Sequence, residues 1–357
     1  MSRAARPGRT PARPGAIAAG AVLSVVLASV ALAGCAAPAP SSAPAPASAA
    51  RYVAGGAAPV GAASGRAAAS APACDPYASS LKPSGPPAVT PGSFMNTIKR
   101  RGFLIAGVDQ STYHFGYLNP LDRQIEGFDI DQIRAVAGAI FGINPTDPAV
   151  LTKIRFKAIS DASRIPDVSG ETVKGVAPST PLVDIVAHTM TINCDRLKQV
   201  DFSTVYFDAQ RKTLVVRPAS GKAPTLADLS REHQKACSTR GSDSVTSIQD
   251  AQATAQQVDY WTDCLVLLQE GQVAGIVTDD SILEGMKAQD PNLVITGGSL
   301  KDEPYGLAIS KAHPEFVRFV NAVLAREISS GQWANSYRTW VDIKGPQRPT
   351  WKIAYAG

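Results

Sequence analysis

The sequence predicts an α/β fold with largely parallel sheets. Strand-like apolar runs and helix-like segments alternate in two passages of the chain, over residues 93–217 and 225–298. A strand, a helix and a further strand in short succession form the unit from which parallel sheets are built. No internal repeat of about 20 to 50 residues is present, so a repeat architecture is not indicated.

The first passage begins with an amphipathic segment, SFMNTIKRR, that leads into a short apolar strand, FLIAGV. A turn-rich hairpin and a helix follow; Asp129 or Asp131 is expected to cap this helix, and Gly142 to close it. The sequence KIRFKAI predicts the next strand, and further strands are expected around residues 182–187 and 213–217. The apolar residues of the helix lie at helical spacing, at Ile130, Ile133, Ala137, Ile140 and Phe141.

The second passage repeats this alternation. TLADLSREHQKACST predicts a helix and then a strand, and WTDCLVLLQEGQVAGIVTDDSILEGM predicts a helix, a strand and a helix. The strand-like NLVITGG comes next, and DEPYGLAIS leads into a long helical segment over residues 314–341. Both passages therefore favour α/β domains, and about 265 residues suffice for one large or two medium domains.

The N-terminus has the pattern of a secretory signal. Residues 1–34 combine a basic start, a long apolar run and small residues at the exit. A transmembrane anchor is the alternative, because the apolar run is about long enough to span a bilayer. The ending LAGC resembles the lipobox of bacterial lipoproteins, which implies a lipidated Cys35 and an extracytoplasmic protein anchored to the outer face of the membrane. The basic residues of the signal are Arg3, Arg6, Arg9 and Arg13.

Residues 35–92 are rich in Ala, Pro, Ser and Gly, as in APAPSSAPAPAS, and we expect them to form a flexible tether. Residues 1–34 hold four of the 35 basic residues of the chain and none of its 30 acidic ones. The remainder is therefore close to neutral. No nucleic-acid partner is indicated.

With Cys35 lipidated, four cysteines remain, and they allow three pairings. No CxxC or Cys/His spacing suggests a metal, so disulfides in an oxidising compartment are expected. We expect Cys237 to pair with Cys264, which leaves Cys74 to pair with Cys194.

The segment VDIVAHTMTINCDRLKQVDFSTVYF (residues 183–207) places hydroxyls and a positive charge directly after a strand. Open α/β sheets bind ligands beyond the carboxyl ends of their strands. Thr189, Thr191 and Arg196 follow such a strand, and arginine's planar fork can bond both oxygens of a carboxylate. Taken alone, the segment leaves two interpretations open: a carboxylate site, or a solvated arginine in a surface loop.

Seven motifs in order carry a resemblance to a known family. RGFLIAGVD, EGFDIDQIRAVAGAIFG, SRIP, the segment over residues 183–207, GSDSVTSI, LLQEGQVAGIVTDDSIL and EPYGLAI resemble family 3 solute-binding proteins over residues 93–341. These are polar amino-acid receptors of ABC importers, and the likeness is greatest to glutamate/glutamine-binding lipoproteins of actinobacteria.

The resemblance implies a two-lobed periplasmic-binding-protein fold of type II, in which two α/β lobes are joined by two hinge strands. Residues 93–207 and 305–345 would form lobe 1, and residues 208–304 lobe 2. The hinge crossings would lie near residues 208–212 and 302–305.

The resemblance also implies a role for each site residue. Arg196, with Thr191 and the backbone of Thr189, would hold the ligand α-carboxylate. Asp279 would pair with the α-ammonium, although Asp280 is adjacent and either could instead cap a helix. Arg164 would meet a side-chain carboxylate, the alternative being an arginine that decorates its helix. Further ligand contacts are expected from Gly241, Ser242 and Ser244 and from an aromatic wall of Phe115 and Tyr117, beside which His114 departs from the usual proline.

The function implied is that of a membrane-anchored receptor that captures an acidic or amide amino acid for an ABC permease. Glutamate is expected first, then glutamine or aspartate. The same receptor could instead serve a membrane sensor protein. An enzyme of the cyclohexadienyl dehydratase type is disfavoured because the four histidines are scattered, and no cofactor or metal is expected. The segment over residues 167–181 is several residues longer than is usual in the family. It follows Arg164 directly and therefore bears on where that side chain points.

Overall fold

The computed structural model describes residues 74–170, 181–342, 345–346 and 348–356. The predicted signal peptide, Cys35, the tether up to residue 73 and most of the longer loop over residues 167–181 lie outside the described residues. Among the described helices, none is both long and apolar enough to cross a bilayer.

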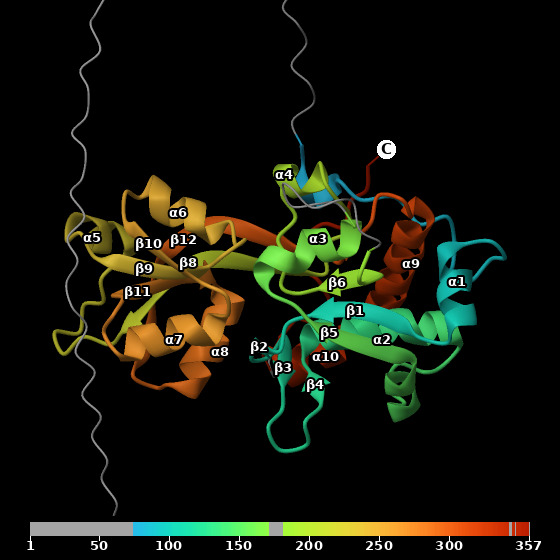
Figure 1. Cartoon of the computed structure of the whole chain (residues 1–357), viewed down its shortest axis with the longest axis horizontal. Helices are drawn as coiled ribbons and strands as arrows, with labels where there is room; N and C mark the ends of the chain where they lie inside the picture. Colours follow the sequence, from blue (N-terminus) through green and yellow to red (C-terminus); the bar gives the residue numbers. More distant parts are fainter. Residues whose placement is uncertain (1–73, 171–180, 343–344, 347, 357) are drawn as a thin grey trace, which may run out of the picture. The chain divides into compact units, whose positions relative to one another are not determined.

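Two five-stranded sheets organise the chain (Figure 1). The first has the order β5 (Ile154–Ala158), β1 (Leu104–Val108), β6 (Ile185–Ala187), β13 (Ala308–Ile309) and β7 (Asp201–Phe202). The second has the order β10 (Thr254–Val258), β9 (Lys235–Thr239), β11 (Gly275–Asp279), β8 (Phe207–Val216) and β12 (Leu293–Tyr305). A small third sheet holds β2 (Ser111–Thr112), β3 (Gly116–Leu118) and β4 (Ile125–Glu126). The strands β5, β1 and β6 are parallel, as are β10, β9 and β11, which confirms the predicted α/β class.

The first lobe is the first sheet with the helices that pack on its two faces. One face is covered by α1 (Phe94–Arg101), α2 (Phe128–Phe141), α9 (Pro314–Ser330) and α10 (Gln332–Trp340), whose apolar side chains share a core with Ala106, Val108 and Ile185. The short helix α3 (Arg164–Ser169) contributes Val168 to the other face. The helix α4 (Cys194–Leu197) and three 3-10 turns, at Pro76–Ala78, Pro148–Lys153 and Asp161–Ser163, also belong to this lobe.

The second lobe is built in the same way on the second sheet. Helices α7 (Trp261–Gln269) and α8 (Asp280–Gln289) enclose one core with Leu214 and Ile276. Helices α5 (Leu226–Arg231) and α6 (Ser244–Asp250) enclose a smaller one with Ala236 and Val277. Each sheet is therefore buried on both faces, which suits its apolar parallel strands.

The prediction that Asp129 or Asp131 caps α2 is wrong. The N-cap is Gly127, with φ 134°, and no side chain makes a capping bond. A Cβ on Gly127 would lie 2.2 Å from the Phe115 carbonyl oxygen, so only glycine fits at this start. Asp129 is instead fully buried, where its carboxylate accepts from the Thr189 N–H at 2.8 Å and from the Tyr206 hydroxyl at 2.6 Å.

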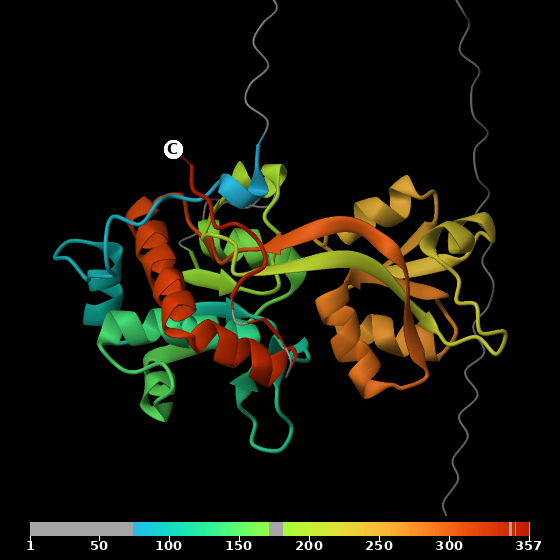
Figure 2. The ribbon, with the colours of Figure 1, turned by 180° about the vertical axis from the view of Figure 1, so that it is seen from behind.

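Strands β8 and β12 lie side by side over most of their length (Figure 2). They pair antiparallel from Phe207 with Tyr305 to Val216 with Leu293, with a register shift between Thr296 and Lys301. Their paired ends at Phe207 and Tyr305 adjoin β7 and β13 of the first sheet in sequence. The predicted hinge crossings lie within these two strands.

Residues 74–92, which we expected to belong to the tether, pack on the first lobe. The buried Ser80 hydroxyl donates to the Phe202 carbonyl at 2.7 Å, and Leu81 forms a bridge with Ala356. The amide of Asn321 donates to Ser80 Oγ at 2.7 Å and to the Leu81 carbonyl at 2.6 Å. These residues are part of the folded body, and the tether that we propose is shortened to the residues before Cys74.

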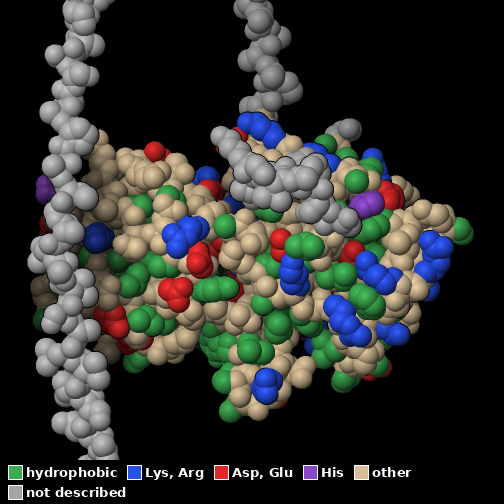
Figure 3. All heavy atoms as spheres, in the orientation of Figure 1, with side chains coloured by type: hydrophobic (Ala, Val, Ile, Leu, Met, Phe, Trp, Pro, Cys, Tyr) green, Lys and Arg blue, Asp and Glu red, His purple; other side chains and the backbone are tan. Residues whose placement is uncertain are grey.

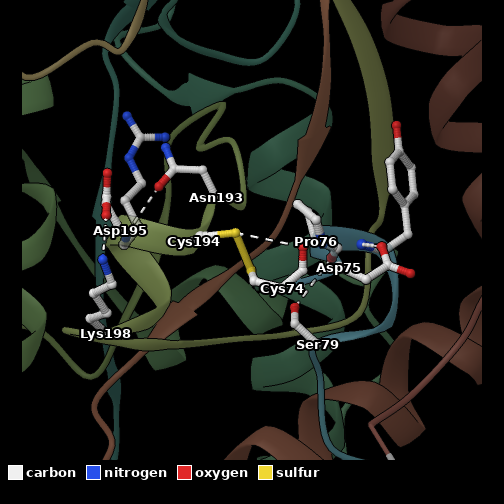
Figure 4. Close-up of a disulfide and its surroundings, with 10 residues drawn as sticks. Cys74, Asp75, Pro76, Ser79, Asn193, Cys194, Asp195 and Lys198 are labelled. Atoms are coloured by element: carbon white, nitrogen blue, oxygen red, sulfur yellow. Dashed lines mark hydrogen bonds and ion pairs between the residues drawn. A yellow bond between two sulfur atoms is a disulfide. The ribbon is translucent and has the colours of Figure 1, made fainter. Parts of the chain in front are cut away.

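Both expected disulfides are present. Cys237 and Cys264 are fully buried and join β9 to α7, with their Cα atoms 5.6 Å apart. Cys74 and Cys194 join the start of the described chain to α4, with Cα atoms 5.8 Å apart, beside Asn193 and Asp195 (Figure 4).

We expect Asn321→Ala to lower the free energy of unfolding by about 2 to 4 kcal/mol, because buried partners lose their hydrogen bonds. Besides its bonds to Ser80 and Leu81, the Asn321 side chain accepts from the Thr204 N–H at 2.7 Å. Urea denaturation measures the loss, and limited proteolysis should show faster cleavage within residues 74–92. The exposed Asn335→Ala is the control. Unchanged proteolysis would contradict the anchoring role of Asn321.

We expect Cys237→Ala/Cys264→Ala to lower the free energy of unfolding by about 3 to 4 kcal/mol in the chain-entropy model. Alanine is chosen over serine because serine would place two hydroxyl groups at fully buried positions. Guanidinium denaturation of the variant and of the parent measures the difference. A loss below about 1 kcal/mol would show that this disulfide does not constrain the unfolded chain in the expected way.

Candidate functional site

The carboxyl ends of the parallel strands in the first lobe bring several predicted residues to one edge. Strand β5 runs into the segment that contains Asp161 and Arg164, and β6 runs into Thr189 and Thr191. Because parallel strands share their direction, these segments lie at the same end of the sheet. The second lobe meets this edge through Gly241, whose carbonyl accepts hydrogen bonds from two arginines of the first lobe.

Arg196 is held in a fixed orientation. It lies in α4, whose N-cap Asn193 accepts from the Arg196 N–H at 2.9 Å. Its guanidinium donates to the Thr191 carbonyl at 2.7 Å and to the Gly241 carbonyl at 3.2 Å, and it lies 3.8 Å from Asp243 Oδ1. Burial and then the neighbouring Arg164 lower the pKa of Arg196. The side chain thus carries a desolvated charge at the meeting of the two lobes.

Arg164 also bonds the Gly241 carbonyl and has several other protein partners. Its guanidinium pairs with Asp161 at 2.7 Å and donates to the carbonyls of Asp161, His188 and Gly241 at 3.0 to 3.2 Å. Its exposed fraction is 3%. Arg164, Arg196 and Gly241 line a pocket of about 320 Å³ together with Met190 and Gln199, among others. Arg164, which we predicted to meet a ligand side-chain carboxylate, thus already pairs with the carboxylate of Asp161.

Thr189 and Thr191 are buried at the same edge. Thr189 adopts a positive φ of 42°, an uncommon backbone for threonine, and its hydroxyl has no hydrogen-bond partner. Thr191 forms an isolated antiparallel β-bridge with Tyr305 of the hinge strand β12. Strained backbone and unpartnered buried hydroxyls concentrate at functional sites, where a ligand can satisfy them.

The residues of the second lobe surround Gly241. Gly241 has φ 81°, and a Cβ there would lie 2.7 Å from the Ala162 backbone, so the close approach of the lobes requires glycine. Ser242 accepts from the Ser244 N–H at 3.2 Å, and the buried Ser244 hydroxyl has no partner. The Thr239 hydroxyl also reaches Asp161 across the interface.

Asp279 and Asp280 have different contacts in the structure. Asp279 occupies the N-cap position of α8, yet its side chain accepts from the Tyr305 hydroxyl at 2.7 Å instead of capping. Asp280 accepts from the Gln210 N–H at 3.0 Å and pairs with Lys212 at 3.3 Å. Both aspartates therefore contact the hinge strands, and of the two only Asp279 is buried.

The predicted aromatic wall divides into two environments. Phe115 is 1% exposed and packs edge-on against Phe207, with ring centroids 5.0 Å apart, so it belongs to the core. Tyr117 lies in the hairpin and packs edge-on against Tyr113. The backbone of Tyr113 approaches Gly285 of α8, which makes the hairpin a second contact between the lobes.

Sequence reasoning missed a group of buried charges at the hinge. Arg211 of β8 is 1% exposed and lies 2.5 Å from Glu303 Oε1 and 2.7 Å from Asp243 Oδ1. It also donates to Ser247 Oγ at 2.8 Å, and its Nε is 4.0 Å from Asp279 Oδ1. The signal in the sequence was the period-two alternation of DAQRKTLVV, which places Arg211 in line with buried neighbours.

Burial and mutual repulsion shift the carboxyl groups of this cluster. Burial raises the pKa of Glu303 to about 8, with Asp279 and Asp243 adding to the effect and Arg211 opposing it. Burial likewise raises the pKa of Asp279 to about 6, against Arg211 and the Tyr305 hydroxyl. Burial acts in the same direction on Asp243, but the nearby Arg196, Arg211 and Lys301 hold its pKa below the ordinary value.

We expect the stability of the ligand-free protein to fall as the pH rises from about 4.5, the ordinary value for glutamate, to about 8. The folded chain keeps its proton at Glu303 in this window while the unfolded chain loses it, so raising the pH favours unfolding. Glu303→Gln should make the fall shallower across this whole window, from about pH 4.5 to about 8. Urea denaturation across pH measures it, with the exposed Glu284→Gln as the control. Identical slopes in Glu303→Gln and the parent would contradict the raised pKa.

Comparisons with known proteins agree on one family. The model of bacterial extracellular solute-binding proteins, family 3, matches residues 104–343. The ABC transporter glutamine-binding protein GlnH of Bacillus subtilis is 31% identical over 68% of this chain and 83% of the relative. The glutamate-binding protein GluB of Corynebacterium efficiens is 27% identical over 61% of this chain and 71% of the relative.

Among solved structures, an ancestral arginine-binding protein bound to glutamine matches with a TM-score of 0.58. It is 27% identical, and the match covers 68% of this chain and 99% of that one. Its agreement with the fold, together with the family match over two sheets and both hinge strands, leads to one assignment. The chain belongs to the bacterial extracellular solute-binding proteins of family 3.

Proposed function

We propose that this chain is the substrate-binding lipoprotein of an ABC importer and captures an acidic or amide amino acid by closure of its two lobes. Buried polar atoms of both lobes that make no hydrogen bond are the observation that supports this proposal. The hydroxyls of Thr189 and Ser244, the Nε of Arg211 and both carboxylate oxygens of Glu303 are buried and make no hydrogen bond. Such groups are costly to leave unpaired, and a polar ligand held between the lobes would satisfy them.

The α-carboxylate of the ligand would bind at Arg196. This guanidinium already touches both lobes, through Thr191 and Gly241. A carboxylate that bonds it bidentately would be stabilised by the two charges and by the low dielectric of the buried interface. Thr191 and the backbone around Thr189 lie within the same segment and would complete this end of the site.

The α-ammonium would bind at Asp279. The Tyr305 hydroxyl donates to one oxygen of this carboxylate. The other oxygen, Oδ1, lies 4.0 Å from the Arg211 Nε. A buried carboxylate with a raised pKa gains stability from an added positive charge, which lowers that pKa again. This arrangement favours a zwitterionic amino acid.

The side-chain group would lie toward Arg164, which is why glutamate stands first among the ligands that we propose. Arg164 shares its charge with Asp161, so an amide that meets the same fork is the alternative. His188, the histidine nearest the site, is 2% exposed and bonds the Ile159 carbonyl at 3.0 Å, as a packed core residue does. That packing supports a receptor over an enzyme with a histidine acid or base.

The membrane side of the proposal depends on the sequence. The signal-like residues 1–34 and the LAGC ending support lipidation at Cys35, and the residues before Cys74 would connect the anchor to the body. The permease is the proposed partner. Charges of both signs are interspersed with hydrophobic side chains on the face shown in Figure 3, a pattern that does not favour a nucleic-acid partner.

We expect L-glutamate to bind, and Arg196→Ala to weaken its binding at least about 100-fold, because a buried charge-assisted contact is lost. Arg164→Ala should weaken glutamate more than glutamine. Titration calorimetry with L-glutamate, L-glutamine, L-aspartate and L-arginine measures both effects. Arg240→Ala, an exposed arginine of the second lobe, is the control. No heat with any of the four, from protein shown to be folded and ligand-free, would refute the amino-acid assignment.

A further inference from the structure

Glu303 is the most deeply buried carboxylate near the hinge. It lies on β12, two residues before Tyr305, and its exposed fraction is 0%. Its Oε1 pairs with Arg211 at 2.5 Å and the Thr191 side chain lies beside it, but neither oxygen makes a hydrogen bond of good geometry. A carboxyl group that has exchanged its water shell for one ion pair is costly to bury, so its presence calls for a reason.

The location of Glu303 is within the proposed ligand site. Residues two apart on a strand share one face, so Glu303 points to the same side of β12 as Tyr305. The Tyr305 hydroxyl donates a hydrogen bond to Asp279. The carbonyl of Pro304, the residue after Glu303, accepts a hydrogen bond from the Ile192 N–H at 2.7 Å. Glu303 therefore lies between Asp279 and the strand-end segment that holds Thr191.

The positive charges around Glu303 are unevenly placed. Arg211 contacts Glu303 at 2.5 Å and Asp243 at 2.7 Å, and it lies 4.0 Å from Asp279. Arg196, at 3.8 Å, and the half-exposed Lys301, at 3.2 Å, also pair with Asp243. Among the described ion pairs, Glu303 and Asp279 therefore share Arg211 alone, and a further positive charge beside them would be stabilised.

We propose that Glu303 is a second acceptor for the ammonium group of the ligand, beside Asp279. The inference rests on the proposed function, because it assumes that an amino acid binds between the lobes. The ammonium carries three N–H donors, so one carboxylate cannot satisfy it. Asp279 and the free oxygen of Glu303 would take two of them, and the Thr189 hydroxyl, which is buried without a partner, lies within the same site.

A purely structural ion pair between Arg211 and Glu303 is the competing explanation. It would hold β8 against β12 and would treat ligands with and without an ammonium alike. The two explanations therefore differ in one measurable quantity. That quantity is the preference of the protein for an amino acid over its desamino analogue.

The experiment measures this preference by calorimetry on the full-length chain at pH 7. The ligands are L-glutamine with 4-carbamoylbutanoate, and L-glutamate with glutarate; each second compound lacks only the amino group. We expect the parent protein to prefer the amino acid at least about 100-fold. Glu303→Gln should reduce this preference at least about tenfold, mainly by weakening the amino acid.

Two variants serve as controls. Glu327→Gln makes the same chemical change at another buried glutamate, on α9 of the first lobe, and should leave the preference unchanged. Glu303→Asp keeps a carboxyl group but withdraws it by one methylene, and should give an intermediate preference. If Glu303→Gln does not fold, the Glu303→Asp value alone decides: an unchanged preference overturns the proposal.

The failures of the two proposals are distinguishable. If the parent binds no amino acid, the proposed function fails and the role of Glu303 falls with it. If the parent binds and discriminates, but Glu303→Gln weakens both members of a pair by the same factor, only the role of Glu303 is overturned. Thermal unfolding of each variant separates a loss of affinity from a loss of folded protein.

Discussion

A guanidinium that is 1% exposed, as that of Arg211 is, must find its counter-charges within the protein because it has left its hydration shell behind. Arg211 finds them on β12 at Glu303 and in the loop before α6 at Asp243. These contacts connect the two hinge strands to the part of the second lobe that faces Arg196. The position of that loop, and with it the approach of Gly241 to the first lobe, depends on this one buried charge. Removing it would leave uncompensated carboxylates, which is strongly destabilising.

The interface between the lobes is polar, in contrast to the cores on either side of it. Arg164 and Arg196 reach across it to a single carbonyl, and the Thr239 hydroxyl reaches back to Asp161. Polar contacts of this kind exchange readily for water when the lobes separate, whereas the apolar cores of each lobe do not. The polar contacts around Gly241 therefore hold the lobes together at a modest net free energy, whereas apolar burial holds each lobe as a unit.

The sequence predicted the α/β class and the alternation of strands and helices, because periodicity is a local property. Both disulfides were predicted from the cysteine spacing together with the resemblance to the family. Sequence reasoning failed where a distant residue decides. Gly127 starts α2 because the Phe115 carbonyl lies against it, and Asp129 turns to Thr189 and Tyr206, contacts that no local pattern reveals. Residues 74–92 read as tether by composition, yet Asn321 holds them through hydrogen bonds. The carboxylates around Arg211 come from segments far apart in the sequence, so only the fold brings them together.

The disulfide between Cys74 and Cys194 has a mechanical consequence. Cys194 lies two residues before Arg196, in the same short helix. Any tension in the chain that precedes Cys74 is transmitted through a covalent bond to the helix that carries this arginine. Residues 74–92 and their bonds to Asn321 lie downstream of that bond and receive less of the load. The helix α4, which carries Arg196, is therefore the part of the folded body that receives such a load most directly.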